Sequence, residues 1–69
     1  MIAIELDEER EGIEIFVDEQ GIDEMQRYLQ FIRAKKDHMH LLAGGELSEI
    51  LVNSQNERIK HAKLIYCED

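Results

Sequence analysis

The spacing of apolar residues changes once in the first half of the chain, from alternation in two short segments to a repeat of three or four residues. Residues 2–6 and 13–17 carry Ile, Leu or Val at every second position, and the polar segment 7–12 between them ends in glycine. This pattern predicts two strands joined as a hairpin. From residue 19 to about 36 the apolar residues recur at helical spacing: Ile22, Met25, Leu29 and Ile32, with Tyr28 beside them. The sequence therefore predicts a hairpin followed by one amphipathic helix that begins between residues 18 and 23.

The second half of the chain predicts further strands. Residues 38–42 favour a third strand that ends at the glycine pair 44–45, and residues 46–52 fit either a strand or irregular structure. Residues 58–66 favour a final strand. The order β-β-α-β-(β)-β indicates an α+β fold, a small antiparallel or mixed sheet with one helix packed on one face. Because no repeat, linker or proline interrupts the chain, we expect one domain over residues 1–69.

Alternation also assigns the strand residues to two faces. One phase is largely apolar, and we expect it to meet the helix and form the core: Ile2, Ile4, Leu6, Ile13, Ile15, Val17, Met39, Leu41, Ala62, Leu64 and Tyr66. The opposite phase is mixed, and no second helix is predicted to cover it: Glu5, Glu14, Phe16, His38, His40, His61, Lys63 and Ile65. The sequence therefore predicts an open sheet face that is available for binding.

The charge of the chain is strongly acidic and unevenly distributed. Sixteen acidic residues against eight lysines and arginines give a net charge of −8. Ten of the acids lie within residues 1–24, where Arg10 is the only basic residue. Nucleic acids and anionic membranes are polyanions that such a surface repels, so neither is an expected partner. A basic protein surface is the better match.

The sequence predicts a protein that is neither exported by an ordinary signal peptide nor inserted in a membrane. No apolar run approaches the roughly 20 residues that span a bilayer, and no lysine or arginine precedes an apolar stretch at the start. Cys67 is the only cysteine, so no disulfide can form within the chain. These features predict a cytoplasmic protein.

Three histidines are the strongest candidates for a chemical site. His38 and His40 point to the same face of the predicted third strand, and His61 has the matching phase on the last strand. Three converging imidazoles could bind zinc with an open fourth position, which leaves a small metal-binding protein as an alternative function. Catalytic residues are not predicted. The carboxylates of residues 7–11, here called the acidic turn, should be solvated and lack the fixed pair that acid–base catalysis needs. We therefore expect no enzyme activity and no cofactor.

Most of the chain resembles one known family. Residues 18–32, 37–41, 44–49 and 59–66 resemble, in order and composition, the immunity protein 32 family of bacterial polymorphic toxin systems. The most specific part is the histidine-flanked strand followed by Gly-Gly-x-Leu-Ser-Glu. Members of the family usually carry a short insert ending in Trp before the two glycines, whereas here residues 42–43 lead directly into them.

The resemblance implies a cytoplasmic, non-enzymatic protein that binds and neutralises a cognate toxin. The acidic charge favours a basic toxin domain such as a nuclease, because electrostatic complementarity steers association. A structural homodimer that uses the open sheet face is a further alternative. The expected partner-binding residues lie on the acidic turn and on that face: Glu5, Asp7, Glu8, Glu9, Glu11, Glu14, Phe16, His38 and His40.

Overall fold

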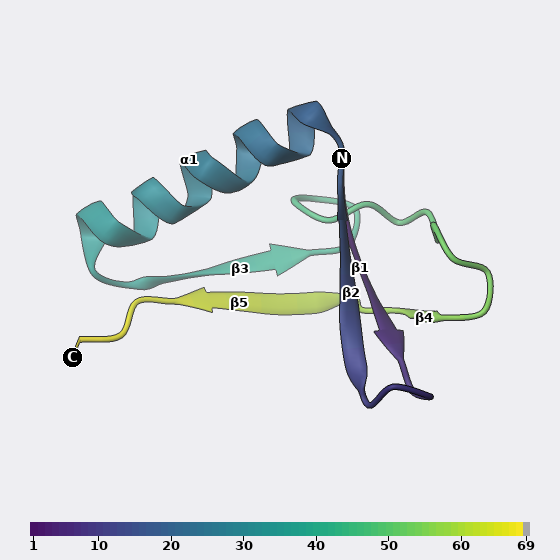
Figure 1. Ribbon diagram of the computed structural model, residues 1–69. Coiled ribbons are helices and arrows are strands. Elements are labelled where there is room, and N and C mark those ends of the chain that lie inside the picture. Colours follow the sequence, from purple (N-terminus) through teal and green to yellow (C-terminus); the bar gives the residue numbers. More distant parts are fainter. Residues whose placement is uncertain (69) are drawn as a thin grey trace.

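A computed structural model describes residues 1–68 and has an α+β fold with one helix and two small antiparallel sheets (Figure 1). The elements are β1 (Ile2–Asp7), β2 (Gly12–Val17), α1 (Glu19–Lys35), β3 (His38–Leu42), β4 (Glu57–Arg58) and β5 (His61–Ile65). One sheet has the strand order β2-β1-β4, and the other pairs β3 with β5. Among residues 1–68 no helix has the length and apolar character needed to cross a bilayer.

The predicted α+β class with one helix is confirmed, but the strands form two sheets instead of one, because the chain passes from one sheet to the other near its end. The predicted last strand is divided into β4 and β5 by Ile59 and Lys60. The Ile59 N–H donates to the Ile4 carbonyl of the first sheet (2.8 Å). The carbonyl of the following residue, Lys60, accepts a hydrogen bond from the Ala43 N–H, which directly follows β3 (2.9 Å). Residues 48–56 are irregular and form no strand.

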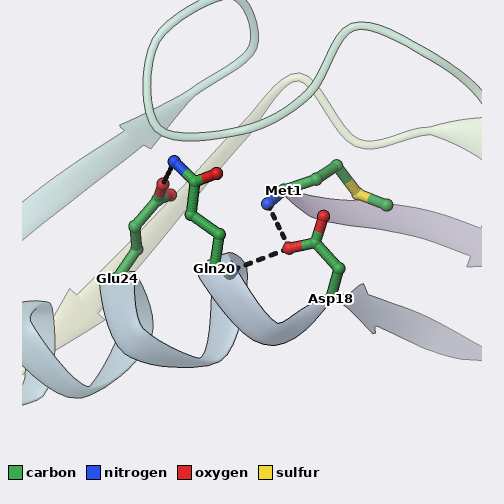
Figure 2. A network of polar contacts seen from close by, with 5 residues as sticks. Met1, Asp18, Gln20 and Glu24 are labelled. Atoms are coloured by element: carbon green, nitrogen blue, oxygen red, sulfur yellow. Dashed lines mark hydrogen bonds and ion pairs between the residues drawn. The ribbon is translucent and has the colours of Figure 1, made fainter.

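The helix begins within the predicted range and is capped at both ends. Asp18 is the N-cap, and its Oδ1 accepts a hydrogen bond from the Gly21 N–H (2.8 Å) and contacts the Met1 amino group (2.5 Å) (Figure 2). Gly21 lies so close to the first strand that an added Cβ would be 1.9 Å from the Met1 carbonyl oxygen. Only glycine fits there, which is why this residue is tolerated in the first turn. The helix ends at Lys35, and the residue that caps it, Lys36, has a left-handed backbone (φ 52°).

The core lies where the hairpin crosses the β3–β5 sheet beneath α1 (Figure 1). Its buried centre joins residues of both sheets and of the loop after β3: Ile2, Ile4, Leu41 and Leu47. Met25 and Tyr28 of the helix pack against this centre. β1 is buried on both faces, since Ala3 and Glu5 are as inaccessible as the isoleucines between which they lie.

Several residues that alternation assigns to the core are exposed. Ile13, Ile15 and Val17 retain 56%, 54% and 41% of their surface, although they share a face with the buried residues of β1. β2 is an edge strand, and the helix and β5 leave its apolar face partly uncovered. On the helix, Leu29 is 47% exposed and Ile32 is buried. The helix therefore meets the core along a narrower stripe than its apolar spacing predicts.

Candidate functional site

An acidic cleft lies between the turn that follows β1 and the segment that leads into β4. Its volume is about 460 Å³. Ten residues line it: Leu6, Asp7, Glu8, Glu9, Arg10, Glu14, Asn53, Gln55, Asn56 and Glu57. Five of these are acids and one is a base, so the cleft concentrates negative charge in a concave surface, where charges of one sign reinforce each other's field.

The first wall of the cleft is the four-residue turn of the hairpin. The Arg10 N–H donates to Asp7 Oδ1 (3.3 Å), and the Glu11 N–H donates to the Glu8 carbonyl (3.2 Å). Glu11 has a left-handed backbone (φ 53°), which lets the chain reverse before β2 begins. Arg10 also lies 3.5 Å from Asp7 through its Nε, but its side chain is largely exposed. A surface ion pair of this kind contributes little to stability and leaves the guanidinium free to move aside.

The second wall is the polar segment before β4. Asn53 closes a turn by accepting from the Gln55 N–H through its Oδ1 (3.0 Å) and from the Asn56 N–H through its carbonyl (3.1 Å). Asn56 then donates from its side-chain amide to Glu14 Oε1 (3.0 Å), which joins this wall to β2. The pattern of polar residues predicts a turn here, but alternation within strands gives no signal that this turn faces the hairpin.

Glu5 fixes the second wall from beneath. The prediction that Glu5 lies on an exposed binding face is wrong, because its exposed fraction is 0%. Its two carboxyl oxygens accept hydrogen bonds from the Val52 N–H and from the Asn53 N–H (3.0 Å), where the irregular loop covers β1. A buried carboxylate that satisfies two backbone donors holds a loop in place. Glu5 is thus a positioning residue for the cleft and is not accessible to a partner.

The structure brings together some of the predicted partner-binding residues and separates the others. Four of them line the cleft: Asp7, Glu8, Glu9 and Glu14. Glu11 belongs to the same turn but is not part of the lining. Phe16 is half-buried on β2, on the same face as Ala3 and Glu14. His38 and His40 lie on the other sheet and are exposed. Sequence reasoning missed Glu57 and the asparagines of the second wall.

The histidines form a second polar surface, on the outer face of the β3–β5 sheet. His40 Nδ1 lies 2.8 Å from His61 Nε2, and the two rings stack with their centroids 5.0 Å apart. The His38 ring contacts the His40 ring edge-on. The pKa of His40 is lowered, first by partial loss of solvent and then by the positive charge of Lys63 and of the neighbouring histidines. Within residues 1–68 no three His, Cys, Asp or Glu side chains are grouped to hold a metal ion.

Function has to be inferred from the residues of this chain alone. No protein-family model, curated protein or solved structure matches it. The acidic cleft brings together four of the nine predicted partner-binding residues. It combines a defined concave shape with a strong charge, and it is the feature on which we base a function.

Proposed function

We propose that the chain is an inhibitor that binds a cationic protein through the acidic cleft, as an immunity protein binds its cognate toxin. The observation that carries this proposal is the convergence of five carboxyl groups from two distant segments on one cleft of about 460 Å³. Charged side chains crowded in this way repel one another, and a cationic side chain of a partner relieves that repulsion. The cleft therefore favours lysine or arginine side chains of a bound protein.

The net charge of −8 supports the same proposal at longer range. A field of this sign accelerates encounter with a basic surface and discourages encounter with nucleic acid, which is the natural substrate of a basic nuclease. Covering the basic surface of such a toxin with an acidic protein would block access of the nucleic acid. The resemblance to the immunity protein 32 family points to the same class of partner. Binding alone suffices for inhibition, and no catalytic step is involved.

The test is the kinetics of binding to a basic toxin domain, sought first among the products of neighbouring genes, measured at several salt concentrations. The cleft variant replaces Glu8, Glu9 and Glu57 with Gln. A control variant with the same change of net charge replaces exposed acids elsewhere: Glu19→Gln, Asp23→Asn and Glu68→Gln. Both variants should associate more slowly, because both weaken the long-range field. Only the cleft variant should dissociate faster, because only it removes direct contacts.

Salt gives a second readout of the same proposal. The association rate of the wild type should fall steeply as salt rises, since the Debye length shrinks from about 10 Å at 0.1 M to about 3 Å at 1 M. Equal dissociation rates for the cleft and control variants would contradict a role for the cleft. An association rate that ignores salt would contradict electrostatic recognition altogether.

A further inference from the structure

The chain exposes more surface than a compact monomer of its size. Its accessible surface is 5304 Å², whereas a folded monomer of 8.1 kDa is expected to expose about 4500 Å². Its radius of gyration is 12.7 Å, against about 11 Å for a compact domain of this length. The excess area, about 800 Å², equals the share that one partner contributes to a standard protein interface. The fold therefore has an interface-sized area still to cover.

Part of this excess is an apolar groove between β2, α1 and β5. Its volume is about 370 Å³, and six residues line it: Ile15, Val17, Ile22, Met25, Gln26 and Leu64. Ile13 continues the same face along β2, and the three β-branched residues of that strand keep roughly half of their surface. A contiguous exposed apolar surface of this kind marks an interaction site in small soluble domains.

Among residues 1–68 no strand pairs with the outer edge of β2. The carbonyls of Ile2 and Ile4 accept hydrogen bonds from Ser48 and Ile59, so both point away from β2. Backbone groups alternate in direction along a strand. The residues of β1 that bond to β2 are therefore the alternate ones, Ala3, Glu5 and Asp7. The residues paired with Ile2, Ile4 and Leu6 then direct their N–H and C=O groups to the free edge. These residues are the exposed ones: Val17, Ile15 and Ile13.

We propose that a second copy of this chain covers this edge, with the two β2 strands antiparallel and Ile15 on the two-fold axis. In that register Ile13 lies opposite the partner subunit's Val17. Ile13, Ile15 and Val17 of each strand then present their free N–H and C=O groups to the same three residues of the other strand. Antiparallel strands bond through directly opposed pairs of this type. Their side chains also lie on one face, so the same contact joins the two apolar surfaces. The edge is thus complementary to itself both in hydrogen bonding and in shape, as a two-fold interface requires.

This dimer uses a different surface from the cleft, so the inference does not depend on the proposed function. Glu14 directs its side chain to the face opposite that of Ile13 and Ile15. The acidic turn precedes the first residue of β2 and so lies outside the proposed strand pairing. Each dimer would present two acidic clefts. Two chains of charge −8 repel each other, so salt should tighten the dimer, whereas it should weaken binding of a cationic protein.

The test is sedimentation equilibrium from about 1 to 200 µM in 0.1 M and 0.5 M NaCl. The wild type should sediment at twice 8.1 kDa at the higher concentrations, with tighter association in 0.5 M NaCl. Ile15→Lys places two like charges on the two-fold axis and should sediment as a monomer. Ile65→Lys, at an exposed isoleucine on β5, should leave the dimer intact. A wild type that remains monomeric throughout would overturn the proposal, even if another protein bound the groove.

Cross-linking keeps the proposal testable if the lysine variant does not fold. In a Cys67→Ser background, Ile15→Cys should form an intermolecular disulfide on mild oxidation. Directly opposed residues of a hydrogen-bonded pair are about 5.5 Å apart between Cα atoms, within the range that a disulfide spans. In the same background Ile13→Cys should form no intermolecular disulfide, because its two copies would lie about 14 Å apart along the strands. Equal cross-linking of the two variants, or none at Ile15→Cys, would show that the register is wrong.

Discussion

Replacing Glu5 with Gln should destabilise the protein far more than a change of one charge on the surface. Glu5 Oε1 accepts from the Asn53 N–H, and Oε2 accepts from the Val52 N–H, both at a site closed to solvent. An amide presents only one acceptor oxygen, so one backbone donor would lose its partner and face an NH₂ group. Losing a hydrogen bond to a charged group costs about 1.5–3 kcal/mol, and the orphaned donor adds to it.

That loss is large for a chain of this length. At about 0.05–0.15 kcal/mol per residue, 69 residues give a total stability of roughly 3–10 kcal/mol. With a urea m-value of about 1 kcal/mol/M, the unfolding midpoint of Glu5→Gln should fall by about 2 M. Glu9→Gln removes the same charge from the exposed turn and should change the free energy of unfolding by less than about 0.5 kcal/mol.

Circular dichroism in urea gives the midpoint, and amide hydrogen exchange gives the state of the loop. In Glu5→Gln the amides of Val52 and Asn53 should exchange faster than in the wild type, because the loop they belong to has lost an anchor. If both the midpoint and the exchange of these two amides match the wild type, the buried carboxyl does not hold the loop, and the account of the second wall of the cleft fails.

Three further outcomes are expected. Gly21→Ala should lower the free energy of unfolding by about 1–3 kcal/mol in urea titration, since its Cβ would meet a backbone oxygen 1.9 Å away; an unchanged midpoint would contradict this close approach. Ile32→Ala should cost about 2–5 kcal/mol, but Leu29→Ala, at a half-exposed position, less than half as much, and equal losses would contradict the narrow helix stripe. The pKa of Glu46 is held below 4.5, mainly by the hydrogen bond from the Leu42 N–H. The ionised Glu46 carboxylate therefore contributes its full stabilisation above pH 4.5, and this stabilisation is lost as the pH falls through the lowered pKa. Glu46→Gln should consequently flatten the acid limb of the profile of unfolding free energy against pH.

The elements that depend on local sequence could be predicted. The hairpin follows from two alternating segments around a turn that ends in Gly12, and the helix follows from apolar spacing with Asp18 as its cap. Both signals are complete within about twenty residues of chain. The division of the last strand at Ile59 could not be predicted, because it depends on hydrogen bonds to residues far away in the sequence.

The assignment of faces failed for a related reason. Alternation says which residues share a face, and it correctly places Ile13 and Ile15 with Ile2 and Ile4. It does not say how far the covering layer extends, so it cannot distinguish a central strand from an edge strand. It also assumes one polar face, whereas the loop after β3 closes over β1 and buries Glu5. The acidic turn was predicted, but its convergence with Glu57 on one cleft was not.

The exposed edge of β2 also bears on solubility. A short, apolar, β-branched strand with a free edge is the kind of segment that stacks into aggregates when chains meet in bulk. Acidic residues lie on both sides of this strand, from Glu8 to Glu11 before it and at Asp18 and Glu19 after it, and Glu14 interrupts it. Stacking many copies in register would align these like charges, and charged flanks of this type oppose such growth. As the pH approaches the isoelectric point near 4.7, the net negative charge that opposes stacking is lost, and the protein should begin to precipitate through β2.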